Sequence, residues 1–410
     1  MSNPTQEQLR FILEGGILAP SADNQHRLRF DVDQAGVNVW YNGDQLPEVG
    51  GYKRVLALLS LGAVSENLAV AASRFGIRAE LVLFPDPGKP DLIFKAIWKP
   101  WENRTEDTGS LWETIPHRHT NRSLRYRGPG LSTDDRARLE RVTASSPGCG
   151  LTWLDATRTR GHALELMRLA EGERFRNRVQ HEELFEAIRF DVGWRQSCDE
   201  GLPPGALAIE PPLRPAFALL RHWRIMRLVN LIGGYRVLGW RAADLPCRFA
   251  PHLAVISVRQ LDDEAIFSAG QAFQRVWLMA TQLGLVLQPL PASALYALEG
   301  ARHEGVQHAG TVLSRRAVGI RTTTLRQSQE LLQVFADRHG HFLSKKIGCC
   351  DIPLTVCEIG QHFLIPVLVG MWEVVEGQAA RHCIRERLYL FRPNWRKNSA
   401  APHTLPSSSR

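Results

Sequence analysis

The chain is poor in cysteine, and it lacks the paired spacing that accompanies metal-binding or redox cysteines. Seven cysteines occur in 410 residues, an odd number with no Cys-x-x-Cys pair. This usage is typical of free thiols in a reducing compartment, so we predict a cytoplasmic protein. Cys198 and the vicinal pair Cys349-Cys350 have no recognisable activating base beside them, and ordinary thiols explain them better than a nucleophile does.

The later part of the chain also lacks a long hydrophobic run. The late apolar stretch 363–372 is broken by Pro366 and is too short to cross a bilayer. The first eight residues show neither the basic start nor the apolar core of a secretory signal. With 44% hydrophobic and 22% charged residues and a mean hydropathy of −0.20, the composition is that of a globular protein. We therefore expect no membrane partner.

Several cofactor and metal motifs are absent. No Gly-x-Gly-x-x-Gly follows a predicted strand, and the only Gly-Lys pair is followed by proline, so neither a Rossmann site nor a P-loop is expected. His303 and His308 are five residues apart and would diverge on a helix, whereas a shared zinc ion needs both on one face. His117 and His119 lie in an arginine-rich turn. We predict no metal site.

The net charge of +8 comes from 50 basic and 42 acidic residues. The excess arginine is dispersed, and nothing resembles a recognition helix, a zinc finger or an RNA-binding strand signature, so we predict no nucleic-acid partner. Guanidinium groups also match phosphate oxygens bidentately, and a phosphate-bearing cofactor is the better explanation of the arginine content.

Hydrophobic periodicity predicts an α+β chain. A first helix is expected with Asn3 as its N-cap and Pro4 in its first turn. A long buried helix is expected over 52–75 with Gly76 as its C-terminal cap. Further helices are expected after Ser132 and over 159–189, 216–238, 262–283 and 328–338. Short strands are expected over 28–32, 37–41, 79–84, 92–98, 150–154 and 252–258 and before Pro289. The proline-rich segment 201–215 cannot be a regular helix and is either a lid or a long connection.

Three segments carry most of the chemistry. In the first (residues 19–26, Ala-Pro-Ser-Ala-Asp-Asn-Gln-His), Ser21, Asn24 and Gln25 follow a helix ended by proline, so a rigid turn presents short hydroxyl and amide groups. These groups suit the polar edge of a flat ligand, and ordinary capping of the turn is the alternative.

The second segment is residues 115–123, Ile-Pro-His-Arg-His-Thr-Asn-Arg-Ser. Arg118 and Arg122 flank a turn that can present two guanidinium groups to one anion, and His119 or Thr120 adds a donor. A solvated basic turn is the alternative.

The third segment is residues 269–289. It begins Ala-Gly-Gln-Ala-Phe-Gln and continues as an amphipathic helix. Gly270 suits a close backbone approach, either to a ligand or to another helix. Gln271 and Gln274 keep helical spacing on the same segment.

In this order, the three segments resemble the nitroreductase-like flavoproteins that bind FMN. The likeness is greatest to the single-chain, two-lobed subgroup with dormancy-associated mycobacterial members. It covers about residues 5–348, and residues 62–68 and 84–87 also look like that subgroup. His26-Arg27 departs from the family, where Pro-Trp is usual.

The resemblance implies an α+β fold with mixed sheets flanked by long helices. Its lobes would be residues 1–110 and 111–348, joined in one chain as a pseudo-dimer, with 201–215 as the lid. Residues 349–410 form a tail that resembles nothing we recognise. The protein would be a monomeric pseudo-dimer or a homodimer.

The resemblance also implies a function. One FMN would lie between the lobes, and electrons from NAD(P)H would pass in pairs to a small-molecule acceptor such as a nitroaromatic or a quinone. No catalytic acid or base is assigned. A non-catalytic protein that binds or sequesters FMN beneath the lid is the alternative. The residues expected to bind the cofactor are Ser21, Asn24, Gln25, Arg118, His119, Thr120, Arg122, Gly270 and Gln271.

Overall fold

The computed structural model describes most of the first 298 residues and one later strand. The described residues are 3–33, 36–42, 46–49, 51–101, 110–126, 128, 130–296 and 298, together with the backbone of 363–371. The chain divides into the units Met1–Val374 and Val375–Arg410, and every described residue belongs to the first. The predicted helix at 328–338 lies outside the described residues.

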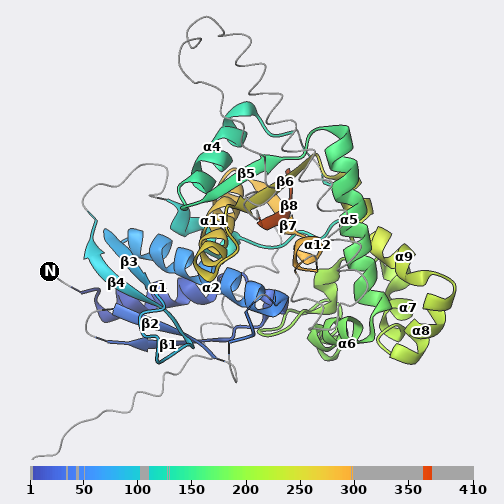
Figure 1. The fold of residues 1–410 in the computed structure, drawn as a ribbon, viewed down its shortest axis with the longest axis horizontal. Helices are drawn as coiled ribbons and strands as arrows, with labels where there is room; N and C mark the ends of the chain where they lie inside the picture. Colours follow the sequence, from blue (N-terminus) through green and yellow to red (C-terminus); the bar gives the residue numbers. More distant parts are fainter. Residues whose placement is uncertain are drawn as a thin grey trace, which may run out of the picture. The chain divides into compact units, whose positions relative to one another are not determined.

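The first sheet is built from the first hundred residues (Figure 1). Its strands are β1 (Leu28–Val32), β2 (Gly36–Tyr41), β3 (Ile77–Leu83) and β4 (Leu92–Pro100). They pair antiparallel in the order β1-β2-β4-β3. Helix α1 (Gln6–Ile17) precedes the sheet, and the long helix α2 (Tyr52–Ser73) connects β2 to β3 and packs on α1.

The second sheet has the same strand order. Its strands are β5 (Cys149–Trp153), β6 (His252–Val258), β7 (Leu285–Pro289) and β8 (Phe363–Met371), paired antiparallel in the order β5-β6-β8-β7. Helix α4 (Thr133–Ala144) precedes this sheet, and the long helix α11 (Asp263–Gln282) connects β6 to β7 and packs on α4. In both sheets the strands therefore lie in the order first, second, fourth, third. In both, a long helix connects the second strand to the third.

Helices α2 and α11 pack against each other through a glycine on each (Figure 1). A Cβ on Gly62 would lie 2.2 Å from the carbonyl oxygen of Phe267, and a Cβ on Gly270 would lie 2.3 Å from that of Leu59. Each glycine therefore meets the carbonyl three residues before the other glycine. Such reciprocity is the signature of a two-fold contact.

Polar pairs beside this crossing repeat the reciprocity. Glu66 and Arg275 form an ion pair at 2.6 Å, and Gln274 donates to the side-chain oxygen of Asn67 at 2.7 Å. Glu66 and Gln274 each lie four residues after the glycine of their helix, and Asn67 and Arg275 each lie five residues after it. Glu66, Asn67 and Gln274 are buried, so these pairs fix how the two helices meet.

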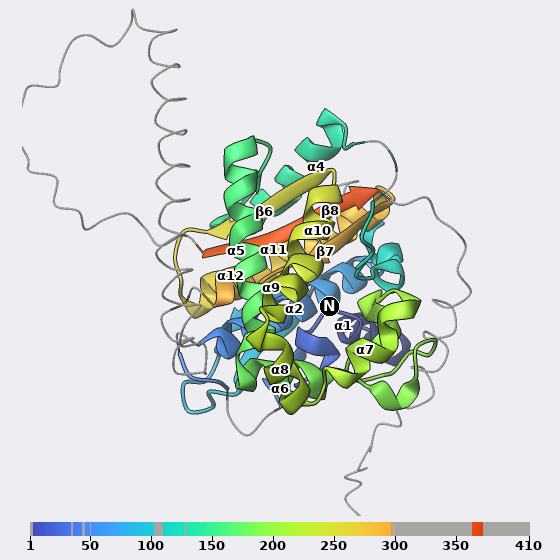
Figure 2. The same ribbon diagram turned by 90° about the vertical axis from the view of Figure 1, so that its right-hand side faces the viewer.

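A group of helices is inserted between β5 and β6. Its members are α5 (Thr157–Arg176), α6 (Arg178–Ala187), α7 (Arg214–Leu219), α8 (Trp223–Leu231), α9 (Gly234–Gly239), the π-helical turn η6 (Trp240–Asp244) and α10 (Leu245–Phe249). Met226 and Phe175 are among the residues of a separate small core within this group. Figure 2 shows α5 to α9 from the side on which they lie outermost.

Several sequence predictions need correction. The helix expected over 159–189 is two helices, because Asn177 leaves helical geometry and its side chain caps α6 by accepting from the Val179 amide. The helix expected over 216–238 is three short helices, with Gly233 at φ +82° between α8 and α9. The N-cap of α1 is Thr5, which forms a capping box with Gln8, in place of Asn3.

The expectation of mixed sheets is also wrong for the described strands. The strands of both sheets pair antiparallel. Leu287 of β7 also forms a parallel contact with Thr120, but this contact is an isolated bridge and not part of a strand pair. Strand β8 lies within the stretch 349–410 that we predicted as an unrecognised tail, yet it is an inner strand of the second sheet. The division into lobes 1–110 and 111–348 stays a prediction.

Within the described part of the chain, α2 is the helix that is long and apolar enough to span a bilayer, and 72% of its apolar window is buried in the protein. Helix α2 ends at Ser73 with Arg74 as its C-cap, so Gly76 is not the cap that we predicted; it follows two residues later with φ +71°, in the turn that leads to β3.

Candidate functional site

A cavity of about 390 Å³ lies where the turn after α1, the segment before α4, and helices α5 and α11 meet. This volume falls within the range of small-molecule sites. The walls are largely apolar, and two aromatic rings of α11, those of Phe273 and Trp277, belong to them. Other apolar side chains in the wall include Leu56, Leu59, Phe175, Leu184, Leu207, Phe217, Leu238 and Leu290.

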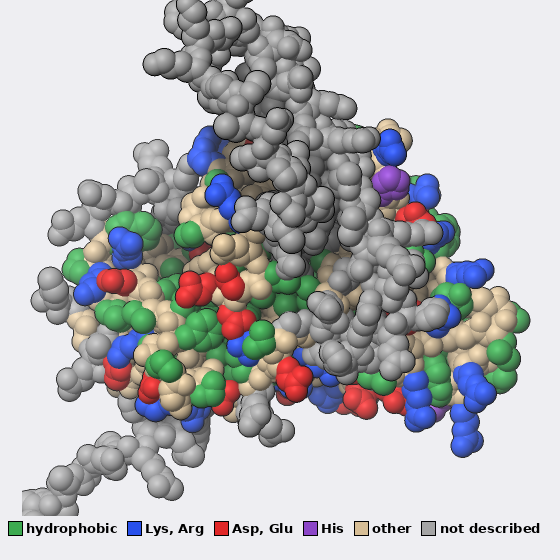
Figure 3. All heavy atoms as spheres, in the orientation of Figure 1, with side chains coloured by type: hydrophobic (Ala, Val, Ile, Leu, Met, Phe, Trp, Pro, Cys, Tyr) green, Lys and Arg blue, Asp and Glu red, His purple; other side chains and the backbone are tan. Residues whose placement is uncertain are grey.

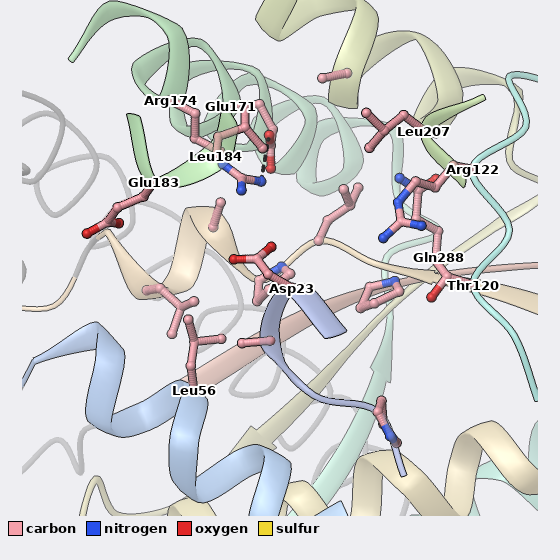
Figure 4. A pocket seen from close by; sticks show the side chains of 18 of the residues that line it. Asp23, Leu56, Thr120, Arg122, Glu171, Arg174, Glu183, Leu184, Leu207 and Gln288 are labelled. Atoms are coloured by element: carbon pink, nitrogen blue, oxygen red, sulfur yellow. Dashed lines mark ion pairs between the residues drawn. The ribbon is translucent and has the colours of Figure 1, made fainter. Parts of the chain in front are cut away.

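Hydrogen-bond donors line one end of the cavity. Figure 4 shows Arg122 pointing into it beside Thr120 and Gln288. The Thr120–Leu287 bridge and a hydrogen bond from the Asn121 amide to the Leu287 carbonyl (3.1 Å) fix this segment against β7. Because the residues before Arg122 are held in this way, its side chain enters the cavity.

The Arg122 guanidinium is deeply buried. Burial lowers its pKa, and the Asp23 carboxylate opposes that effect. Its Nη1 donates to the Ala206 carbonyl at 3.3 Å. Among the described residues, no carboxylate forms an ion pair with it. A buried guanidinium that lacks an ion pair among the described residues is a strong candidate to bind an anionic ligand.

Another part of the wall carries charges of both signs. Glu171 and Arg174 on α5 form an ion pair at 3.5 Å, and Asp23 points toward them (Figure 4). Burial disfavours the charge on Arg174, but Glu171, Tyr296 and Asp23 together outweigh it, so the pKa of Arg174 is raised. Arg174 therefore stays positive and offsets part of the negative charge of this wall.

The turn after α1 adds a serine hydroxyl to the cavity. Ser21 lines the cavity, and its buried Oγ has no hydrogen-bond partner among the described residues. The following Asp23 and Asn24 have φ of +51° and +57°, a region that Asp and Asn tolerate better than most residues. The Asn24 amide donates to the carbonyls of Asp199 (3.2 Å) and Gly201 (3.0 Å), which ties the turn to the segment beginning there.

A chain of hydrogen bonds forms a further edge of the cavity. Tyr296 donates to Gln180 (2.6 Å), Gln180 donates to Tyr52 (2.9 Å), and Tyr52 donates to Glu183 (2.8 Å). Burial raises the pKa of both tyrosines, so both hydroxyls stay protonated. Sequence analysis missed these residues, because they lie far apart in the chain and share no motif: Tyr52 is on α2, Gln180 and Glu183 are on α6, and Tyr296 follows the short helix Ala292–Leu295.

The structure brings together three of the predicted site residues, Ser21, Thr120 and Arg122. Arg118 does not line this cavity. Its guanidinium carbon lies 4.4 Å from the ring centroid of Trp277, and its Nη2 donates weakly to the Leu18 carbonyl at 3.4 Å. The expected pair of arginines is therefore split, with one in the cavity and one stacked behind its aromatic wall.

The remaining predicted residues lie outside the lining. Gln25 accepts from Arg27, and the exposed ring of His119 lies 3.0 Å from the His117 carbonyl. The close approach expected of Gly270 is to α2, and Gln271 follows it on α11. The described residues contain no group of His, Cys, Asp and Glu side chains placed to hold a metal ion.

The proline-rich segment 201–215 forms part of the wall. Leu207 and Ile209 line the cavity, and the Ala206 carbonyl accepts from Arg122. Two 3₁₀ turns, Pro204–Leu207 and Pro211–Leu213, replace regular helix here, as the prolines predict.

No family model matches the chain, and no curated protein matches it. Among solved structures, the chain is similar to a nitroreductase with bound FMN from Desulfitobacterium hafniense DCB-2. The identity is 12%, the match covers 67% of this chain and 93% of the other, and the TM-score is 0.26. A TM-score this low supports no conclusion about the fold or the function of this chain.

Proposed function

We propose that the protein is a nitroreductase-like flavoprotein that binds FMN in this cavity and transfers electrons in pairs from NAD(P)H to a small acceptor. The observation that carries the proposal is the buried Arg122 guanidinium, which has no ion pair among the described residues and faces a largely apolar cavity. It lies on one of the three segments that resemble the family. The unpartnered Ser21 Oγ comes from a second, and Phe273 and Trp277 from the third.

The lining fits the parts of FMN. Arg122 and Thr120 would hold the phosphate, because a guanidinium and a hydroxyl both donate to its oxygens. Ser21 would donate to the polar edge of the ring, and the aromatic and aliphatic walls would cover its apolar faces. Arg118 would act through Trp277, by fixing the indole against which the ring lies.

The reciprocal α2–α11 contact supports the proposal of two fused lobes. The equivalent of the Ser21 turn is the turn after α4, and there Arg275 donates to the Ser145 hydroxyl while paired with the buried Glu66. The Ser145 hydroxyl also donates to the Val142 carbonyl at 2.7 Å, so it has no donor left for the polar edge of a second flavin, the role proposed for Ser21. We therefore expect one FMN per chain.

When bound, FMN supplies the two-electron chemistry, and the protein's task is to bind, orient and shield it. Leu207 and Ile209 exclude water from one side of the cavity. The chain Tyr296-Gln180-Tyr52-Glu183 holds protonated hydroxyls at its edge, which fixes the shape of the wall.

A second candidate is an FMN-binding protein without turnover. The observation that favours it is the bonding of segment 201–215 to both sides of the cavity, through Asn24 to Gly201 and through Arg122 to Ala206. A segment held at two points would act as a lid that keeps nicotinamide from the flavin.

The test of binding is the flavin content of the purified protein. We expect one FMN per chain, and we expect Arg122→Gln to weaken FMN binding about 10- to 100-fold, the loss typical of a charge-assisted hydrogen bond. Arg125→Gln is the matched control, because Arg125 is exposed and outside the lining. A wild-type protein that neither carries nor takes up FMN would end the proposal.

Turnover is tested on the same sample. Anaerobic addition of NADPH or NADH bleaches the flavin absorbance if the protein is an oxidoreductase. An unbleached flavin that dithionite still reduces identifies the non-catalytic candidate.

A further inference from the structure

The outer surface of the inserted helices combines arginine with exposed aliphatic side chains. We define the α8–α9 surface by Arg224, Arg227, Leu228, Leu231, Ile232 and Arg236. All six are exposed. Blue and green side chains gather over these helices at the lower right of Figure 3.

The charge in this region is of one sign. Residues 211–243 contain six arginines and no aspartate or glutamate. Arg241 is paired with Glu210 at the edge of the region. Within the part of the chain that the structure describes, no carboxylate forms an ion pair with Arg224, Arg227 or Arg236. Their charge is therefore available to an anionic partner.

The aliphatic side chains of the surface are among the most exposed in the molecule. Ile232 is 88% exposed, Leu231 78% and Leu228 65%. Exposing three adjacent large aliphatic side chains to water is unfavourable, and such patches usually mark a contact site.

Helical geometry places both kinds of side chain on one face. Arg224, Arg227, Leu228 and Leu231 follow the i, i+3, i+4, i+7 spacing of a single face of α8, while Met226 on the opposite face is fully buried. The helix therefore faces outward with aliphatic side chains beside guanidinium groups, which is unusual for a face that meets only water.

We propose that the α8–α9 surface binds the surface of an anionic lipid bilayer. Leu228, Leu231 and Ile232 would enter the boundary between headgroups and acyl chains, and the arginines would meet the lipid phosphates. Long arginine side chains suit this role, because their stems lie along apolar surface while their charged ends reach the phosphates. The expectation of no membrane partner rested on the absence of a spanning segment, and a surface contact needs none.

The mixture of groups favours a bilayer over an acidic protein. A protein interface commonly has an apolar centre and a charged rim. On α8 the two arginines come first and the two leucines follow on the same face, so the charge lies beside the aliphatic side chains and does not surround them, and a bilayer surface offers phosphates next to hydrocarbon at every point. The proposal rests on this surface alone and does not depend on the flavin.

The test is co-sedimentation of the full-length protein with lipid vesicles. We expect binding to vesicles of phosphatidylcholine mixed with phosphatidylglycerol, weak binding to phosphatidylcholine alone, and loss of binding as salt rises. Arg224→Gln with Arg227→Gln should lower partitioning about thirtyfold, from the attraction that each basic residue contributes near an anionic surface. Leu231→Ser with Ile232→Ser should lower it at least tenfold.

The matched control is Arg138→Gln with Arg141→Gln on α4. These two arginines are exposed and have the same spacing as Arg224 and Arg227, and the control removes the same charge. We expect it to partition like the wild type. All these positions are exposed, and circular dichroism verifies that each variant is folded.

Each other result overturns the proposal. Equal binding to neutral vesicles would show that charge is not used. An equal loss in the α4 control would show an effect of net charge alone. Unchanged binding in both α8 variants would place the contact elsewhere. Light scattering in which Leu231→Ser with Ile232→Ser dissociates an oligomer would assign the surface to a second copy of this chain.

Discussion

His181 illustrates how burial of one side chain couples the molecule to pH. Its ring is fully buried on α6, 4.6 Å from the ring of Phe185 and 5.2 Å from that of Trp223. Its Nε2 lies 2.7 Å from the Leu220 carbonyl and so carries the hydrogen, and its Nδ1 has no partner among the described residues. Protonation would add a buried N–H without an acceptor, and burial accordingly lowers the pKa of His181.

The lowered pKa predicts a loss of stability in acid. As the pH falls below about 6.5, the unfolded state takes up a proton that the folded state refuses. The free energy of unfolding therefore falls as the pH drops from that value toward the folded pKa, and levels off below it. Urea denaturation between about pH 5 and pH 8 measures this slope.

The matched variant is His181→Gln, which keeps an amide donor for Leu220 and has no titrating group. We expect a shallower slope than in the wild type, although not a flat one, because burial also lowers the pKa of His252. A variant with the wild-type slope would show that His181 does not titrate in this range.

At the residue scale, the sequence indicates which kinds of side chain bind a ligand better than it indicates where each side chain points. Arg118 and Arg122 have the same chemistry and lie four residues apart, yet one stacks on Trp277 and the other enters the cavity. The difference arises from the backbone. Arg118 ends the 3₁₀ helix Leu111–His117, whereas Arg122 follows the bridge to β7. Neither feature has a local signal in the sequence.

Among the elements, the contact of α2 with α11 makes a sharp prediction. Gly270→Ala would place a methyl group 2.3 Å from the Leu59 carbonyl oxygen and 2.9 Å from the Leu59 Cα, where backbone must move. We expect a loss of about 1–3 kcal/mol in the free energy of unfolding, as for other overpacked sites.

Gly161→Ala is the control for this prediction. Gly161 also lies within a long helix, α5, but a Cβ there would meet no atom within 4 Å. We expect this variant to gain about 0.5–1 kcal/mol, because alanine favours helix over glycine. Urea denaturation of both variants measures the difference, and equal midpoints would contradict the close approach of the two helices.

The observed helices and strands agree closely with the sequence prediction where the apolar pattern is long. The cores of α2 and α11 and strand β6 lie where the periodicity predicts them. The break between α5 and α6 has no signal in the apolar pattern, because Asn177 does not disturb the spacing of the apolar residues. Asn177 ends α5 and is the N-cap of α6. Gly233-Gly234 did signal the break after α8, but the surrounding apolar residues favoured a continuous helix.

At the scale of the whole molecule, the reciprocal contact between α2 and α11 has no local signal in these helices. Their sequences share little beyond a glycine followed by a polar pair, and the contact depends on where backbones approach. The place of β8 was hidden for another reason. Pro366 lacks an amide hydrogen and argues against an inner strand, yet it is paired in register with Val255 of β6. The likeness to a known family also ended before that strand.

The position of β8 leads to a prediction about truncation. A chain ending before Phe363 would lose the strand between β6 and β7, leaving β7 without its neighbour and β6 with an open edge. Unpaired edges of this kind promote aggregation, so we expect little soluble protein and no bound flavin. A chain ending at Val374 keeps β8 and removes only the second unit. We expect it to stay folded, with the thermal midpoint and flavin content of the full chain. If the shorter fragment were as soluble and as stable as the longer one, β8 would contribute no structure to the second sheet, and the two sheets would no longer share one four-strand order.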